Sequence, residues 1–391
     1  MSIHYRLSQR AKALRLSPIR KVLAKADEAK RRGIKVTDLS AGRPDFDTPT
    51  HIIKAAKKAM DEGFVHYTAS AGIRELQEAI CERIKIELQV DYDPEQVIIT
   101  AGATEAIFIA LQAILNPGDE VLVPDPMYVY YEGWSNLSGA KCVSIPLESS
   151  DDFRLKAELI ENYVTPKTRA IIVTSPHNPT GQVYSREELV KLGDLAVKHD
   201  FYIISDDIYS RLIYDEVEYF NVAQIPEVKE RTMIVQSFSK SYAMDGWRIG
   251  YLVAPQPITA QAVKLHQHAI SCPNSFVQMG ALAALKGSQD CVRQMLREFD
   301  RRRCFLIQCM DEMGLEYIRP KGAFYLFLSI KKFGMDSESF CEFLFNKAQI
   351  AIVPGNAFGD GGEGYVRLSY ATSYNEIEEG MQKIKAVITE L

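Results

Sequence analysis

Short apolar segments alternate with helical patterns through the middle of the chain, and this alternation constrains the fold more than any other feature. The strand candidates are residues 97–100, 120–123, 170–174, 201–205, 233–236 and 248–253. Helical patterns separate several of them, as at 186–199. Short strands joined through helices predict an α/β fold with a mostly parallel central sheet covered by helices on both faces. Ligand-binding groups gather at the carboxyl ends of the strands of such a sheet.

The last third of the chain has a different pattern and predicts a smaller α+β domain. It contains a charged helical stretch at 290–313, apolar segments at 322–327 and 365–370, a helix at 337–347 and a final helix from about 374. Within the charged stretch, Arg301, Arg302 and Arg303 are interpreted as a solvated helix face. We expect a helix opened by Ser17-Pro18 and closed by Gly33 to complete this domain.

The length of the chain supports two domains. With 391 residues, the chain exceeds the size at which a single hydrophobic core stops growing. We expect a large domain over residues 45–288 and a small domain made of residues 1–44 and 289–391.

Charge and cysteine content exclude several classes of function. The net charge of −5 leaves no basic footprint for nucleic acid, and no segment has the length and hydrophobicity of a membrane span. The segment Met1–Arg6 lacks the apolar core of a signal peptide. The seven cysteines include no C-x-x-C pair, and their odd number argues against a disulfide framework. These features predict a cytoplasmic protein.

Four strand ends carry residues that can bind a ligand. They are the turn Gly102-Ala103-Thr104, the segment containing Asn178, the segment containing Asp206, Asp207 and Tyr209, and the segment containing Ser237, Ser239 and Lys240. The turn offers backbone N–H groups at a helix N-terminus, which suits a phosphate. Neither G-x-x-x-x-G-K-[ST] nor G-x-G-x-x-G occurs, so nucleotide binding has little support.

The lysine is the most informative of these residues. Lys240 lies between two serines, and Arg248 follows eight residues later. Such anion-binding groups around an amine suit a lysine joined to a phosphorylated aldehyde. The pattern S-x-S-K-(x)7-R resembles the lysine site of fold-type I aminotransferases, which use pyridoxal phosphate (PLP).

The resemblance extends from about Leu39 to Tyr370 with the motifs in the same order. It points to the class I/II aminotransferases of the aspartate aminotransferase superfamily. Within them, the sequence most resembles the prokaryotic subgroup labelled aromatic-amino-acid aminotransferase, aspartate aminotransferase or aminotransferase A. The resemblance implies a fold-type I PLP-binding large domain, PLP as cofactor and a homodimer with shared active sites.

The resemblance also implies a role for each candidate residue. Lys240 forms the Schiff base with PLP, Asp206 keeps the pyridine nitrogen protonated, Asn178 and Tyr209 bind the ring hydroxyl, Tyr128 stacks on the ring, and the phosphate is bound by Gly102, Ala103, Thr104, Ser237, Ser239, Arg248 and Tyr67. Tyr67 comes from the neighbouring subunit. The substrate is bound by Gly42, Asn178 and Arg367, of which Arg367 clamps the α-carboxylate.

Three further observations qualify this assignment. Asp207 stands where the family more often has glutamate, and we expect this second acid to be interchangeable. His266 and His268 lack a third ligand nearby, so we expect a structural role and no metal site. No second cation that would select acidic side chains is evident from the sequence.

The expected reaction is transfer of an amino group from an L-amino acid, aromatic or aspartate-like, to a 2-oxo acid such as 2-oxoglutarate, by a ping-pong mechanism. A PLP-dependent carbon–sulfur β-lyase on the same scaffold is the alternative, because the cofactor residues barely discriminate between the two. A transcription regulator built on this fold would carry a separate basic domain. None is evident ahead of the first helix, so we disfavour that class.

Overall fold

The computed structural model describes residues 6–14 and 16–391. Residues 1–5, which include most of the segment used to argue against a signal peptide, lie outside this description. The largest sheet of the structure consists of β2 (Val97–Thr100), β3 (Glu120–Asp125), β4 (Lys141–Pro146), β5 (Thr168–Thr174), β6 (Tyr202–Asp206), β7 (Thr232–Ser237) and β8 (Gly250–Val253). The spatial order is β2-β8-β7-β6-β5-β3-β4. In the described part of the chain, β8 is the one strand of this sheet that runs antiparallel to its neighbours, which confirms the mostly parallel sheet.

Helices cover both faces of this sheet because successive strand residues point to opposite sides. In β5, Ile172 packs on one face, whereas Ile171 and Val173 pack on the other. The first face is covered by α5 (Ala103–Ile114), α6 (Tyr131–Leu137) and α11 (Gln256–Ile270). The second face is covered by α4 (Arg74–Leu88), α7 (Ala157–Glu161), α8 (Arg186–His199), α9 (Pro226–Lys229) and α12 (Ser275–Lys286), with α3 (Thr50–Asp61) packed on α12.

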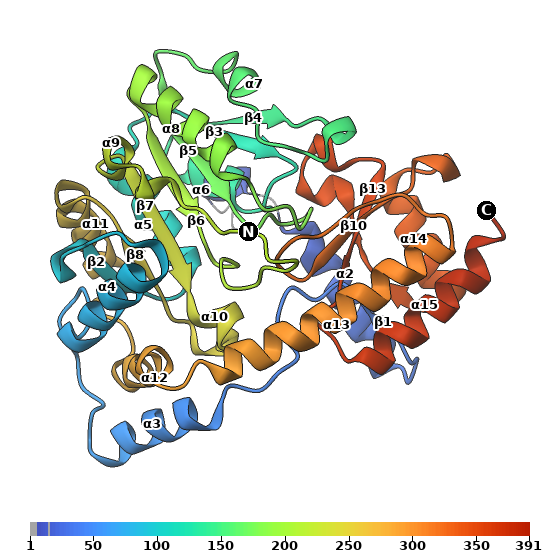
Figure 1. Cartoon of the computed structure of the whole chain (residues 1–391), viewed down its shortest axis with the longest axis horizontal. Helices are drawn as coiled ribbons and strands as arrows, with labels where there is room; N and C mark the ends of the chain where they lie inside the picture. The colour runs from blue at the N-terminus through green and yellow to red at the C-terminus, as the bar shows by residue number, and fades with distance from the viewer. Residues whose placement is uncertain (1–5, 15) are drawn as a thin grey trace, which may run out of the picture.

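A second sheet forms on the other side of the molecule (Figure 1). It contains β9 (Tyr317–Ile318), β10 (Tyr325–Ser329), β12 (Val353–Pro354) and β13 (Tyr365–Ser369), in the antiparallel order β12-β13-β10-β9. A parallel pair, β1 (Thr37–Asp38) with β11 (Ile350–Ala351), lies nearby. Three helices accompany these strands: α13 (Asp290–Glu312), α14 (Ser337–Ala348) and α15 (Tyr374–Ile388).

Two helices connect distant parts of the chain to this second sheet. The long helix α13 runs from beneath the large sheet to the side of α15 (Figure 1). Near the N-terminus, α2 (Pro18–Arg31) packs Ala26 and Ala29 against Val36 and Ala351, as expected for a helix that completes the smaller unit. The described N-terminal segment also contains the short helix α1 (Gln9–Ala13). The exact domain limits at residues 45 and 288 stay a prediction.

The arginine run of α13 corrects one expectation. Arg301 is exposed as expected, but Arg302 and Arg303 are buried. They lie on the same helix stripe as Phe299 and Leu306, which faces the core. Paired carboxylates make the buried charges tolerable. Arg302 contacts Asp45 at 2.7 Å and Glu298 at 2.9 Å, and Arg303 contacts Asp215 at 2.6 Å and Asp300 at 2.7 Å.

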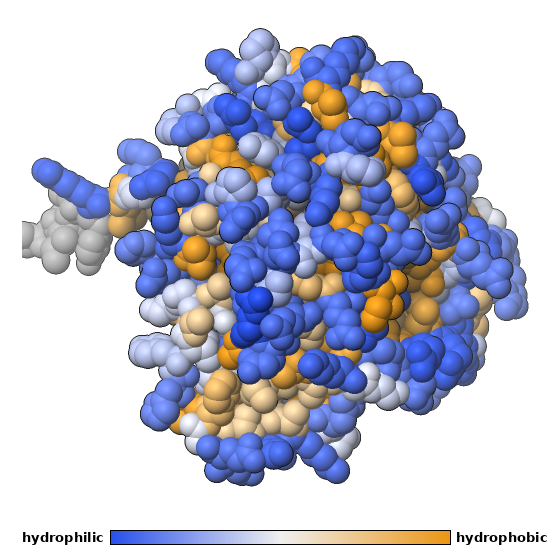
Figure 2. Space-filling view, turned by 60° about the vertical axis from the view of Figure 1, so that its left-hand side comes forward, coloured by the Kyte–Doolittle hydropathy of each residue, from blue (hydrophilic) through white to orange (hydrophobic). Residues whose placement is uncertain are grey.

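One face of the molecule is mainly polar. On the face shown in Figure 2, hydrophilic residues predominate and hydrophobic ones are scattered or gathered in small groups. Within the ranges that the structure describes, no helix combines the length and hydrophobicity needed to cross a lipid bilayer.

Candidate active site

Lys240 lies directly beyond the carboxyl end of β7. Ser237, the last residue of that strand, accepts a hydrogen bond from Ser239 N at 3.0 Å and so caps the short helix α10 (Phe238–Ser241). The lysine is thus carried on one helical turn. Lys240 Nζ donates to Gly42 O at 2.5 Å, and Lys240 forms no ion pair among residues 6–14 and 16–391. Burial, together with the positive charges of Arg367 and Arg248, lowers the pKa of Lys240 to about 8.

Asp206 ends the neighbouring strand β6 and is buried. Tyr131 in α6 donates its hydroxyl hydrogen to Asp206 Oδ2 at 2.5 Å, and the same hydroxyl lies 2.6 Å from Thr174 Oγ1. Burial raises the pKa of Asp206 to about 6, and the bond from Tyr131 partly opposes this effect. Sequence reasoning did not identify Tyr131. The cluster of three tyrosines at 128, 130 and 131 was the available signal, but it does not reveal which one faces Asp206.

An anion-binding cradle forms where α5 begins. In the described part of the chain no side chain caps this N-terminus, so its first N–H groups remain available. Gly102 has a φ of 81°, and a Cβ there would lie 2.7 Å from Arg248 Nη2. A larger residue would therefore displace the Arg248 guanidinium, which donates to the carbonyls of Asp245 at 3.0 Å and Ala101 at 3.3 Å. Asp245 accepts the Arg248 hydrogen bond through its backbone carbonyl, so this bond does not depend on which side chain residue 245 carries.

Arg367, in β13, approaches the site from the second sheet. It is 1% exposed, and in the described residues it has no ion-pair partner. Its Nη1 donates to Asn178 Oδ1 at 3.0 Å and its Nη2 to Ser40 O at 2.9 Å, whereas Nε has no hydrogen-bond partner there. The Tyr325 ring lies 4.2 Å from the guanidinium carbon. Burial lowers the pKa of Arg367, because desolvation disfavours the charged guanidinium.

Two further tyrosines border this group. Tyr209 and Tyr325 place their hydroxyl oxygens 2.8 Å apart, and both side chains are buried. Gly42 lies close to Tyr325: a Cβ added at Gly42 would be only 3.0 Å from Tyr325 Oη. Tyr325 and Ser40 are contacts of the candidate residues that sequence reasoning missed; both lie in motifs that the resemblance covered, but neither had an assigned role.

Two adjoining cavities bring these residues together. One, of about 580 Å³, is lined by Ala103, Thr104, Tyr128, Asp206, Ser237, Ser239, Lys240 and Arg248, among others. The other, of about 300 Å³, is lined by Gly42, Tyr128, Asn178, Tyr209, Lys240, Tyr325 and Arg367, among others. Gly102 underlies the first cavity through its contact with Arg248. Tyr67 lines neither cavity and is 89% exposed on its own loop.

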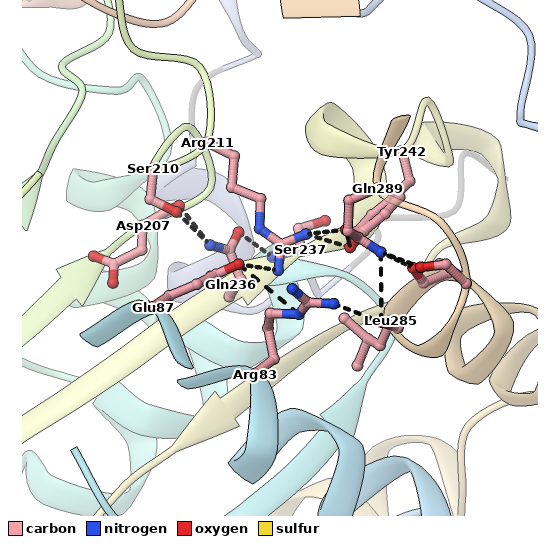
Figure 3. A network of polar contacts seen from close by, with 12 residues as sticks. Arg83, Glu87, Asp207, Ser210, Arg211, Gln236, Ser237, Tyr242, Leu285 and Gln289 are labelled. Carbon is pink, nitrogen blue, oxygen red and sulfur yellow. Dashed lines mark hydrogen bonds and ion pairs between the residues drawn. The ribbon is translucent and has the colours of Figure 1, made fainter. Parts of the chain in front are cut away.

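A network of polar contacts links the end of α10 to the neighbouring segments (Figure 3). Arg211, two residues after Tyr209, pairs with Glu87 at 2.9 Å and hydrogen-bonds the hydroxyl of Tyr242, two residues after Lys240. Tyr242 Oη donates to Gln289 Oε1 at 2.7 Å, next to the start of α13. The network therefore fixes the segments that carry Tyr209 and Lys240 relative to each other.

Two residues outside the cavities have structural contacts. Asp207 is buried and accepts hydrogen bonds from Ser205 Oγ at 2.6 Å and Asn221 Nδ2 at 2.7 Å. These tight contacts argue against the interchangeability that we expected of this acid. His266 is buried with Nδ1 2.9 Å from Glu105 Oε1, next to the α5 N-terminus.

The charges around the cavities fit PLP. Lys240, Asp206 and Arg367 each lack an ion-pair partner within the described residues. Leaving such groups partly or fully desolvated is costly unless a ligand compensates for them. The uncapped N–H groups of α5 and the Arg248 guanidinium can bind a phosphate. Asp206 can accept a hydrogen bond from a pyridine N–H, and Lys240 Nζ can bond to an aldehyde carbon.

Comparisons with known proteins agree with this chemistry. A family model described as aminotransferase class I and II matches residues 34–384. The aromatic-amino-acid aminotransferase 2 of Thermococcus litoralis is 42% identical over 388 residues, covering 98% of either chain. The aspartate aminotransferase of Pyrococcus abyssi is 42% identical, with 91% of this chain and 92% of that protein covered. The structure of aspartate aminotransferase from Thermus thermophilus with maleate has a TM-score of 0.94 at 37% identity, covering 98% of this chain and 100% of that one.

The match covers both sheets and all four strand ends that carry the candidate residues. The family and fold predicted from the lysine motif are therefore confirmed. The chain belongs to the class I and II aminotransferases and is a PLP-dependent amino acid aminotransferase.

Proposed function

We propose that Lys240 holds PLP through Nζ and carries the proton transfers of amino group exchange. The observation that carries this proposal is the set of unpaired charges, Lys240, Asp206 and Arg367, around one pair of adjoining cavities. Each of the three matches a different part of the reacting system. Together they support one site for cofactor and substrate rather than separate structural ion pairs.

PLP, when bound, supplies a conjugated ring that accepts the electrons released as the substrate Cα–H bond breaks. Asp206 would keep its charge beside the pyridine N–H, and Tyr131 would hold the carboxylate in position. Asn178 and Tyr209 would bind the ring hydroxyl, and Tyr128 would stack on the ring face. Arg248, Ser237, Ser239 and the Gly102–Thr104 turn would bind the phosphate.

Lys240 is suited to two roles. Its lowered pKa, about 8, makes the uncharged amine accessible near neutral pH, and this form attacks a carbonyl carbon. As a free amine, Nζ would also accept the proton released from the substrate Cα and donate it again later in the reaction. The contact with Gly42 O keeps Nζ in the part of the site shared by both cavities.

Arg367 would bind the α-carboxylate of the amino acid. Its planar fork can hold both carboxylate oxygens, and its buried position raises the benefit of the pairing. The Asn178 side chain already orients the guanidinium, and Gly42, which has no side chain, would leave room beside its backbone for the substrate carboxylate. Losing Arg367 should therefore affect substrate binding more than cofactor binding.

Aromatic or aspartate-like amino acids are the proposed donors, with a 2-oxo acid such as 2-oxoglutarate as acceptor. The names of the relatives include both aromatic-amino-acid and aspartate aminotransferases. Tyr128, Tyr130 and Trp134 provide an aromatic wall to the cavity, with the Tyr128 and Tyr130 rings 5.3 Å apart and those of Tyr130 and Trp134 5.7 Å apart. This wall supports the acceptance of aromatic side chains.

The proposed working unit is a cytoplasmic homodimer in which Tyr67 reaches the partner's phosphate site. Its exposure supports this, as do the exposed side chains of Phe64 and Val65 just before it in the chain. The segment of Phe64 is held against the start of α12 by Ser275, whose Oγ donates to Phe64 O at 3.0 Å. Exposed apolar groups of this kind favour burial against a second copy.

A panel of amino donors with 2-oxoglutarate and pyruvate tests the proposed reaction. Aspartate, phenylalanine and tyrosine should each be measured for 2-oxo acid formation that depends on the acceptor. Cystathionine should be measured in parallel without an acceptor. Acceptor-independent release of ammonia and pyruvate from cystathionine, without transfer from any donor, would replace the proposed reaction by β-elimination.

A further inference from the structure

Two arginines that the sequence analysis left unassigned line the same cavities as Lys240 and Arg367. Arg20 lies in the first turn of α2, and Arg43 follows Gly42 in the connector after β1. Both line the larger cavity beside Lys240 and Arg248, and both line the smaller one beside Arg367. The chain thus brings a second group of cations to the substrate side of the site.

Neither arginine has an ion-pair partner in the described part of the chain. Two basic residues at the C-terminal end of α2 do: Lys30 contacts Asp38 at 3.1 Å and Arg31 contacts Glu28 at 2.9 Å. The nearest polar contact of Arg20 is Tyr130 Oη, 3.5 Å from its Nε, which is at the outer limit of a hydrogen bond. Both guanidinium groups are therefore available to an anion that enters the cavity.

The charge balance of the cavities points to the same conclusion. Their cationic lining residues are Arg20, Arg43, Lys240, Arg248 and Arg367, and their acidic lining residues are Asp206 and Asp245. In the proposed function, Arg248 meets the phosphate and Arg367 meets the α-carboxylate. Arg20 and Arg43 then remain without a counter-charge, although they border the space that a substrate side chain would occupy.

We propose that Arg20, assisted by Arg43, binds the second carboxylate of dicarboxylic substrates and so selects them. This inference rests on the proposed function and deepens it. The same position accommodates aromatic substrates, because a guanidinium can also stack on an aromatic ring beside Tyr128 and Tyr130. The part of the cavity lined by Arg20 and Arg43 would thus accept both substrate classes, but only dicarboxylates would gain a charge-assisted hydrogen bond there.

Arg20→Gln tests the proposal, and Lys21→Gln is the matched control. Lys21 is the next residue of α2 and loses the same charge, but it lines other cavities. The specificity constant kcat/KM should be measured with 2-oxoglutarate and with phenylpyruvate. A lost charge-assisted hydrogen bond predicts that Arg20→Gln lowers the value for 2-oxoglutarate roughly tenfold more than that for phenylpyruvate. Arg20→Gln with Arg43→Gln should enlarge this difference.

Binding provides a readout that does not depend on turnover. By calorimetry, Arg20→Gln should weaken maleate, a nonreactive dicarboxylate, about tenfold, and change the affinity for 3-phenylpropionate much less. Lys21→Gln should match the wild type for both. Equal losses for both ligands, or no loss in the double variant, would overturn the proposal. Absence of amino transfer in the wild type would instead refute the proposed function, while the maleate titration would still test the two arginines.

Discussion

The buried carboxyl of Asp206 leads to a quantitative prediction about the enzyme without its cofactor. Asp206 is 2% exposed, and its pKa rises from 3.8 to about 6 on folding. Between these two pH values the unfolded chain loses this proton while the folded chain keeps it. The free energy of unfolding therefore falls as pH rises through this window, by about 1.4 kcal/mol per pH unit. The loss reaches about 3 kcal/mol and persists above pH 6.

The Asp206→Asn variant should not lose free energy of unfolding in this way as pH rises, because the amide does not ionise. The Tyr131 hydroxyl can accept from the new amide and donate to Thr174 Oγ1, which lies 2.6 Å away. At pH 8 the free energy of unfolding of the apoenzyme should therefore rise by up to about 3 kcal/mol, with about half of this gain at pH 5. The same variant should bind PLP more weakly, because the pyridine N–H loses its charged partner.

Urea denaturation at fixed protein concentration measures this effect, since oligomer stability depends on concentration. Asp245→Asn is the control, because it removes a carboxylate from the same cavity at a half-buried position. An equal gain in that control would show that the effect is not specific to Asp206. The reasoning would be refuted if Asp206→Asn were no more stable than the wild type at pH 8, or if its gain did not increase between pH 5 and pH 8.

Two further predictions concern the binding of phosphate and carboxylate groups and the dimer. Arg248→Ala should weaken retention of PLP, whereas Arg367→Ala should keep PLP and raise KM for the amino acid at least tenfold, because a buried charged hydrogen bond is lost. Equilibrium dialysis measures PLP retention and steady-state kinetics measures KM. If Arg367→Ala lost PLP and Arg248→Ala only raised KM, the two roles would be reversed. Hybrids of Lys240→Ala and Tyr67→Phe chains should regain activity well above either parent, because one site of each hybrid is intact. Inactive hybrids, with heterodimers demonstrated, would mean that Tyr67 acts within its own subunit or not at all.

Much of the fold was predictable because its signals are local. The strand of Val97 to Thr100 and the helix of Arg186 to His199 have the bounds that their apolar patterns indicate. The strand β4 was missed because its residues are mostly half-buried or exposed at the sheet edge, which leaves no apolar run. Burial of Arg302 and Arg303 was missed for a related reason, since their carboxylate partners include the distant Asp45 and Asp215.

The same difference between local signals and long-range contacts decides which residues of the candidate site could be predicted. Asp206 and Lys240 could be expected near each other because parallel strands bring their carboxyl ends together, and both line the larger cavity. Tyr131 and Tyr325 were not identified, because their roles depend on hydroxyl contacts across 75 and 116 residues of sequence. Arg20 was missed because nothing local distinguishes an arginine that borders a cavity from one on a solvated helix face.

Reduction with borohydride followed by peptide mapping tests the central proposal most directly. If Lys240 holds PLP, reduction should fix the cofactor on the peptide that contains Lys240, and Lys240→Ala should yield no labelled peptide and no turnover. Attachment to any other lysine, or turnover by Lys240→Ala, would contradict the account.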